Sequence, residues 1–212
     1  MSAMLLGERA ASRFEVVGAY GASDSVVHVG ILANACTLAP RAAVGVFDMG
    51  PPLRMALPNP MTPSVVGWLP LTKDEDEQLD TWLADIRTRA SACEYIAFPS
   101  EQRITDPVSG RVTAWKFSCA GFVQTAYAEG AGVPLVVLEK DLPPIDFATI
   151  RLQWQHILGR FSDLEAQRIL HSFGISGSGP WRVLLPGYLV RAFAKGRACL
   201  PYVPVASDLR YP

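Results

Sequence analysis

The sequence predicts an α+β fold, in which a group of strands is followed by a group of helices. Short segments rich in Val, Ile and Phe, separated by Gly and Pro, fill the chain up to residue 71. After residue 72 the apolar side chains recur at helical spacing, and the chain after residue 140 is mainly helical in pattern. Strands and helices are thus grouped and do not alternate, which is typical of an α+β layout.

Four segments in the first part of the chain are expected to be β-strands. They are residues 13–19, 25–33, 42–48 and 65–71. Residues 50–63 contain too many prolines for a central strand, because proline cannot donate a hydrogen bond to a neighbouring strand. We expect this stretch to be a loop or an edge strand.

The first helix is expected over residues 73–91. Thr72 and Glu75 match a capping box, in which each side chain accepts a hydrogen bond from the backbone of the other. Residues 99–111 are polar and contain a turn signal at Asp106, so we expect a surface loop there.

A second helix is expected over residues 119–129, opened by Ser118 and closed by Gly130. A short strand is expected at residues 135–138. The helix spacing predicts a buried stripe made of Phe122, Val123, Ala126 and Tyr127.

Three further helices are expected in the last part of the chain, over residues 146–157, 162–174 and 186–196. The first is opened by Asp146, the second by a capping box of Ser162 and Glu165, and the third by Pro186. Residues 175–180, ISGSGP, are expected to form a flexible joint.

Composition limits the kinds of partner. The chain has 212 residues, of which 50% are hydrophobic, which suits one sizeable domain or a domain with an elaborated end. The formal net charge is −1 and no long basic run occurs, so no nucleic-acid partner is expected. The four cysteines contain no CxxC pair and are widely spaced, which argues against a structural zinc site and a disulfide framework. We expect no metal and no cofactor.

The start of the chain, MSAMLLGERAASRF, lacks the basic region of a secretory signal, and its apolar stretch is short. No apolar run approaches the ~20 residues that span a bilayer. We therefore expect a soluble protein that is cytoplasmic as synthesised, with no membrane span. Export by a signal-less route would leave no trace in the sequence.

Cys119 stands out among the cysteines because it falls in the first turn of a predicted helix. Unpaired backbone N–H groups and the positive end of the helix dipole favour a thiolate there. The small neighbours Ala120 and Gly121 are expected to leave its sulfur approachable, as a nucleophile requires. The alternative is an ordinary buried thiol.

His28 is the single polar side chain in an apolar strand. It is either a hydrogen-bonded core residue or the base for a nearby thiol. Asp48 ends the next predicted strand, and in an antiparallel hairpin it would lie near His28 and could orient the ring. The alternative for Asp48 is capping of the turn at residues 49–51.

Two segments resemble a known family. Residues 116–127, KFSCAGFVQTAY, are similar to the nucleophile helix of the NlpC-type cysteine peptidases, and residues 28–34, HVGILAN, resemble their base strand. Ser118 and Ala120 stand where that family has aspartate and serine, and the 34–41 loop is longer than usual. That loop matters because it sets the register that would bring Asp48 to His28.

The order of the two segments is reversed relative to the standard family, since the histidine strand comes first. This order resembles the circularly permuted branch, which includes the lecithin:retinol acyltransferase-like proteins and several bacterial hydrolases. Permutation is acceptable because a triad is defined by geometry and not by chain order. The resemblance covers residues 13–48 and 115–138.

The resemblance implies a papain-like antiparallel sheet packed against the nucleophile helix. Residues 1–140 would form the catalytic core, and residues 141–212 a helical extension packed on it. His28 would take the proton from Cys119, whose thiolate attacks a carbonyl carbon and whose backbone N–H is one oxyanion donor. Tyr20 and Ser118 are the other candidates for the oxyanion and substrate-binding part of the site; the alternative for Tyr20 is a half-buried aromatic.

Three functional hypotheses follow. The first is a cysteine peptidase or amidase, with bacterial cell-wall peptide as the substrate that the resemblance implies, and export as an antibacterial toxin. The second is a lipid acyltransferase or thioesterase on the same fold. The third is a binding module with an inert site.

Other polar and aromatic residues are interpreted as structural. His156 and His171 lie in predicted helices, and the glycine-rich segment 174–179 lacks the lysine of a phosphate-binding loop. Six aromatic residues of the last third are expected in the core, the alternative being the lining of a groove. They are Trp154, Phe161, Phe173, Trp181, Tyr188 and Phe193.

Overall fold

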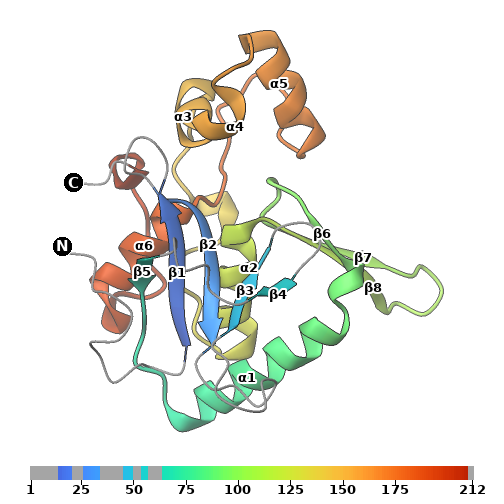
Figure 1. The fold of residues 1–212 in the computed structure, drawn as a ribbon, viewed down its shortest axis with the longest axis vertical. Helices are drawn as coiled ribbons and strands as arrows, with labels where there is room; N and C mark the ends of the chain where they lie inside the picture. Colours follow the sequence, from blue (N-terminus) through green and yellow to red (C-terminus); the bar gives the residue numbers. More distant parts are fainter. Residues whose placement is uncertain (1–13, 21–25, 34–44, 50–53, 57–63, 210–212) are drawn as a thin grey trace.

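The computed structural model describes residues 14–20, 26–33, 45–49, 54–56 and 64–209. It confirms the α+β class: a five-stranded antiparallel sheet and a smaller three-stranded sheet are combined with helices (Figure 1). None of the helices in these ranges has the length and apolarity that a membrane-spanning segment requires.

The large sheet contains the expected strands of the first part of the chain, in the order β4-β3-β2-β1-β5. Within the proline-rich stretch, residues 54–56 form an edge strand, one of its two expected alternatives. The last strand ends at Gly67 and not at residue 71. Pro70 could not donate a backbone hydrogen bond to a neighbouring strand, which disfavours a longer strand. The bounds are β1 (Phe14–Tyr20), β2 (Val26–Ala33), β3 (Gly45–Asp48), β4 (Arg54–Ala56) and β5 (Ser64–Gly67).

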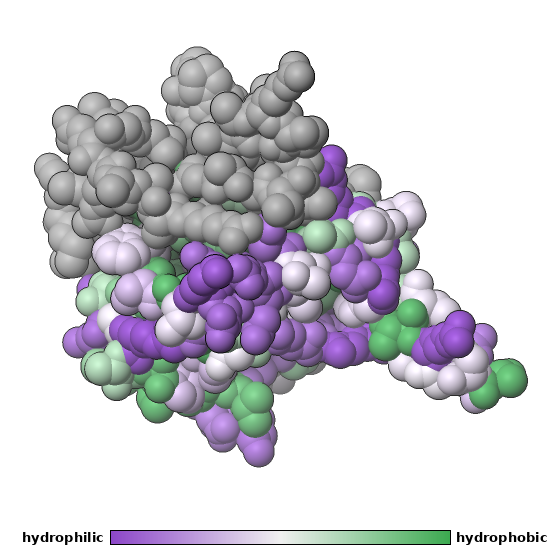
Figure 2. All heavy atoms as spheres, turned by 90° about the horizontal axis from the view of Figure 1, so that it is seen from below, coloured by the Kyte–Doolittle hydropathy of each residue, from purple (hydrophilic) through white to green (hydrophobic). Residues whose placement is uncertain are grey.

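The first helix, α1 (Lys73–Thr88), begins with the expected capping box. The Thr72 N–H donates to Glu75 Oε2 over 2.8 Å, and the Glu75 N–H donates to Thr72 Oγ1 over 3.3 Å. The helix stops before residue 91, because a 3-10 turn (Ala90–Ala92) redirects the chain into the second sheet. Hydrophilic side chains cover the solvent side of α1 (Figure 2).

The second sheet corrects the loop expected at residues 99–111. Residues 101–105 form β7 (Glu101–Thr105), which pairs antiparallel with β8 (Val112–Phe117), and β8 also pairs in parallel with β6 (Cys93–Tyr95). Nearly all of β7 is exposed, so its polar residues show no buried face in the sequence. The expected turn is present, since the Asp106 N–H donates to Arg111 O over 2.8 Å.

The second helix forms as expected, as α2 (Cys119–Thr125) followed by a π-helical turn (Ala126–Gly130). It packs against β2 of the large sheet (Figure 1). Its predicted buried stripe is confirmed, because the four residues that form it are fully buried: Phe122, Val123, Ala126 and Tyr127.

The C-terminal part contains α3 (Phe147–Gln153), α4 (Gln155–Leu158), α5 (Asp163–Ser172) and α6 (Pro186–Lys195). Three short 3-10 turns accompany them, at Glu139–Asp141, Arg197–Cys199 and Ala206–Leu209. The helix expected over 146–157 is broken at Trp154, whose ring lies edge-on to Phe173 with centroids 6.0 Å apart. The strand expected at 135–138 is reduced to a single bridge between Val136 and Tyr202.

The C-terminal helices occupy two different places. Helices α3, α4 and α5 lie together beyond one end of the large sheet, whereas α6 packs on β2 and β5 (Figure 1). Phe193 of α6 fills the space that a side chain at Gly67 would need and lies edge-on to Tyr127, with centroids 5.6 Å apart. Residue 140 as a domain boundary stays a prediction, and α6 shares the core of the large sheet.

Candidate functional site

Cys119 is the first residue of α2, as the sequence predicts. Ser118 caps the helix: its Oγ accepts a hydrogen bond from the Gly121 N–H over 2.9 Å, and its own N–H donates to Ser100 O over 2.9 Å. The Cys119 side chain is therefore placed at the N-terminal end of α2. Only 6% of Cys119 is exposed, so the sulfur is less open than its small neighbours suggest.

Gly121 has a different role from the one expected. A Cβ at this position would lie 1.9 Å from Ser100 O, far inside any allowed contact. The glycine is therefore needed to admit the Ser100 carbonyl against the first turn of α2. The absence of a side chain at Gly121 allows the segment that contains Ser100 to pack closely, and it does not expose the Cys119 sulfur.

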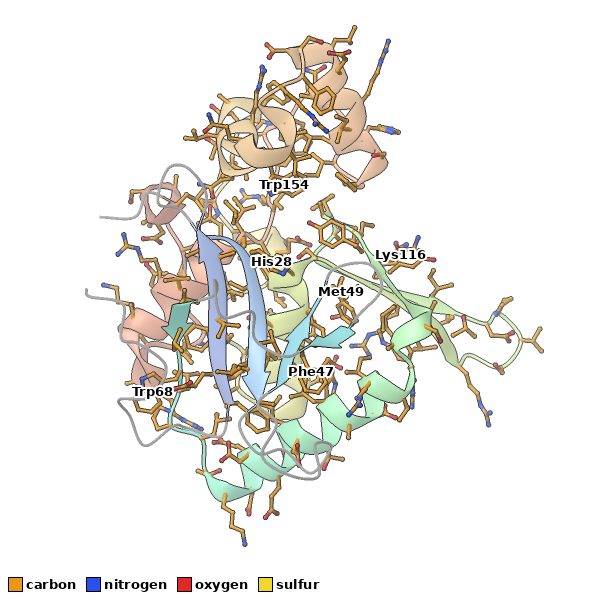
Figure 3. All side chains as sticks on the ribbon, viewed as in Figure 1. His28, Phe47, Met49, Trp68, Lys116 and Trp154 are labelled. Carbon is orange, nitrogen blue, oxygen red and sulfur yellow. The ribbon has the colours of Figure 1, made fainter. Side chains whose placement is uncertain are left out.

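His28 is a half-buried residue of β2, opposite Ala19 of β1. Because α2 packs on β2, the helix that carries the thiol and the strand that carries the imidazole are in contact. The two elements begin at the same end of the molecule and run in the same direction, and His28 lies near that end (Figures 1 and 3). Cys119 is the first residue of α2, and His28 is the third residue of β2. The fold therefore places both residues at the same end of the contact between this helix and this strand.

The hairpin expected between the strands of His28 and Asp48 is confirmed. Strands β2 and β3 are antiparallel neighbours, and Asp48 is opposite Gly30, two positions along β2 from His28. Tyr20 is paired with Val26, just after an irregularity in the β1–β2 register. The side chains of Asp48 and Tyr20 lie outside the described part of the structure, so their roles stay predictions.

Tyr95 is a site residue that sequence reasoning missed. Its strand β6 pairs with β8 so that Tyr95 is opposite Phe117, two residues before Cys119. Burial, and secondly the charge of the neighbouring Cys119, raise the pKa of Tyr95 above its usual range. The phenol therefore keeps its proton at neutral pH and can donate a hydrogen bond near the sulfur. No local pattern signals this role, since it depends on a parallel pairing between distant segments.

The remaining cysteines differ from Cys119 in their surroundings. Cys93 is buried and desolvation raises its pKa to about 11, which suits an inert thiol. Cys199 is exposed, and Cys36 lies outside the described residues. Among the described residues, no group of three or more His, Cys, Asp or Glu side chains is arranged to hold a metal ion.

The aromatic residues of the last third belong to the core, as the sequence predicts. Trp154, Tyr188 and Phe193 are buried, and the other three pack partly buried against the same cluster. A pocket of about 260 Å³ nevertheless lies between α5 and residues 175–181, with Leu170, Ile175 and Trp181 among its walls and His171 at its edge. The side chain of His156 lies outside the described part.

The arrangement combines the groups that acyl transfer by a cysteine needs. A thiol lies at a helix start, an imidazole lies in the strand against which that helix packs, and a neutral phenol lies beside the thiol. Comparison of the chain with family models, with curated proteins and with solved structures finds no match.

Proposed function

We propose that the chain is a cysteine hydrolase of the permuted NlpC type, with a papain-like sheet and helix arrangement. One observation carries the proposal: α2, which begins with Cys119, packs on β2, which carries His28, and both elements begin at the same end (Figure 1). A nucleophilic cysteine needs a base within reach, and this contact supports that pairing.

In the proposed mechanism His28 removes the proton of Cys119, and the thiolate attacks a substrate carbonyl carbon to form a tetrahedral intermediate. The Cys119 N–H and the Tyr95 phenol are the proposed donors to its oxyanion, with Tyr20 as the alternative to Tyr95. Protonated His28 then gives the proton to the leaving group, and water releases the acyl group from sulfur. Asp48 is the proposed partner that orients the His28 ring.

Titration of the thiol tests the proposal without a substrate. The rate of Cys119 alkylation by iodoacetamide is measured against pH in the wild type and in His28→Ala, with each cysteine followed by peptide mass spectrometry. We expect a thiol pKa well below the ordinary ~8.5 that shifts when the imidazole is removed. An ordinary pKa that is the same in both proteins would support the third hypothesis, an inert binding module.

The substrate class that we propose is the peptide or amide bond, with bacterial cell-wall peptide first, because of the resemblance of residues 28–34 and 116–127. Purified protein is incubated with peptidoglycan fragments, with Cys119→Ala as the control. Absence of cleavage by a wild type whose thiol is intact and reactive would reject this substrate and leave the hydrolase assignment standing.

Lipid acyl transfer or thioester cleavage is the second candidate, favoured by the pocket beside α5. Its volume of about 260 Å³ and the apolar walls from Leu170, Ile175 and Trp181 suit a short acyl chain. Release of fatty acid from a panel of phospholipids and acyl thioesters, dependent on Cys119, would support it. If no member of the panel is hydrolysed, the pocket does not serve this reaction.

A further inference from the structure

Residues 96–100 lie between the end of α5 and the start of α2 and contact both. On the α5 side, the N–H groups of Ala97 and Phe98 donate to Phe173 O over 2.9 and 3.2 Å. Gly174, with φ of 92°, approaches so closely that a Cβ there would lie 2.0 Å from Phe98 O. Helix α5 and this segment are thus in backbone-to-backbone contact.

On the α2 side, Ser100 makes backbone contacts with the first turn of α2, which contains Cys119. Its carbonyl accepts the Ser118 N–H and occupies the space left by Gly121. Because both contacts are made by backbone atoms, a shift of Ser100 cannot be absorbed by a side-chain rotation. The placement of Ser100 therefore sets the placement of the first turn of α2, where Cys119 lies.

Glu139 holds Ser100 from the other side. Its two carboxylate oxygens lie 3.1 and 3.3 Å from the Ser100 nitrogen, and donor groups of Ser100 and Leu184 act to lower the pKa of this carboxyl. The carboxylate lies partly buried, and burial raises its pKa against the opposing effect of these donors. A charge that costs desolvation is kept where it accepts hydrogen bonds from the Ser100 backbone.

We propose that Glu139 is a positioning residue for Cys119, acting through Ser100 on the first turn of α2. The inference rests on the proposed role of Cys119 as nucleophile. The chain of contacts has three links: Glu139 to the Ser100 N–H, Ser100 O to the Ser118 N–H, and Ser118 Oγ to the Gly121 N–H. It also ties the first turn of α2 to the C-terminal part of the chain, since Phe173 O at the end of α5 accepts hydrogen bonds from the same segment.

Gln124 provides a matched control. It also makes three hydrogen bonds between α2 and a loop: its Nε2 donates to Val136 O over 2.9 Å, and its Oε1 accepts from the N–H groups of Leu135 and Val136 over 3.2 and 3.1 Å. These bonds lie further along the helix and do not involve residues 96–100. Loss of Gln124 should therefore cost stability without moving the first turn.

The test compares Glu139→Ala, Glu139→Gln and Gln124→Ala in the full chain. Alkylation of Cys119 by iodoacetamide is followed against pH by peptide mass spectrometry, and thermal unfolding is recorded for each variant. We expect E139A to slow the reaction at pH 7 by roughly tenfold, because the first turn of α2 is then no longer held in place relative to His28. E139Q keeps one acceptor oxygen and should react within about threefold of wild type, and Q124A within about twofold.

Two results would overturn the proposal. Equal alkylation rates in E139A and Q124A would show a role in stability alone. Faster alkylation in both Glu139 variants would show that the carboxylate acts through its charge, since removal of a nearby negative charge favours the thiolate. If E139A does not fold, Glu139→Asp, which keeps the charge and shortens the side chain, takes its place, with the same slowing expected.

The same experiment separates this inference from the proposed function. If wild-type Cys119 has an ordinary thiol pKa that His28→Ala does not change, the hydrolase proposal fails. If wild-type Cys119 is reactive and depends on His28, but E139A and E139D react as wild type does, only the role of Glu139 is refuted.

Discussion

Replacement of Gly121 by alanine tests the close contact between Ser100 and the first turn of α2. The new Cβ would lie 1.9 Å from Ser100 O, and the carbonyl must move by more than 1 Å for the contact to reach 3.0 Å. That movement strains residues 96–100 and breaks or weakens the hydrogen bond from the Ser118 N–H to Ser100 O.

The expected loss of stability follows from these changes. Overpacking of a well-packed site costs roughly 1–3 kcal/mol, and the hydrogen bond adds about 1 kcal/mol. The higher helix propensity of alanine returns roughly 0.8–1 kcal/mol. We therefore expect a net loss of about 1–3 kcal/mol, which for a chain of this length corresponds to a fall in Tm of roughly 2–12 °C.

Gly187 offers a matched control in α6. A Cβ at Gly187 would meet its nearest neighbour, Asp208 O, at 3.5 Å, an ordinary contact. Gly187→Ala should therefore raise stability, by roughly 0.5–1 kcal/mol from propensity alone. Thermal and urea unfolding of both variants provide the comparison. If Gly121→Ala is as stable as Gly187→Ala, the Ser100 carbonyl is not packed against α2 as described.

Three further predictions concern stability and thiol reactivity. The Arg197 guanidinium bonds to Glu75 and lowers the pKa of that carboxyl from 4.5 to about 2, so this pair stabilises the fold fully above pH 4.5 and loses its effect as the pH falls towards 2. Arg197→Ala should accordingly lower the free energy of unfolding by about 1 kcal/mol at pH 7, after allowance for partial solvent exposure, and by less at pH 3, as urea denaturation at the two pH values would show. Thr72→Ala removes the cap of α1 and should cost about 1 kcal/mol by the same measurement. At pH 8, iodoacetamide should modify exposed Cys199 readily. It should leave Cys93, whose pKa is raised to about 11, unmodified until the protein unfolds. Modification of Cys93 in the folded protein, detected by peptide mass spectrometry, would contradict its burial.

Elements with local signals could be predicted from the sequence. The capping boxes at Thr72 and Ser162 and the Pro186 helix start are formed within a few residues, and the structure contains each of them. The N-terminal strands were predictable because their apolar runs are bounded by Gly and Pro. Ser118 and Cys119 at the start of α2 belong to the same class of local signal.

Elements that depend on distant partners could not be predicted. Strand β7 is polar and almost wholly exposed, so only its pairing with β8 defines it. Tyr95 is brought to the candidate site by the parallel pairing of β6 with β8. In the chain these two strands are separated by β7, which also pairs with β8. Glu139 reaches Ser100 across 39 positions of the chain. A single sequence contains no periodic trace of such contacts.

These distant contacts also show how the C-terminal part of the chain supports α2. In this fold α2 is held by β2 on one side and by α6 and residues 96–100 on others. Helix α6 and Glu139, which holds Ser100, both come after residue 138 of the chain. Truncation after residue 140 would remove both α6, which packs on α2, and the Phe173 carbonyl, which holds residues 96–100. The C-terminal part therefore belongs to the frame that holds the first turn of α2.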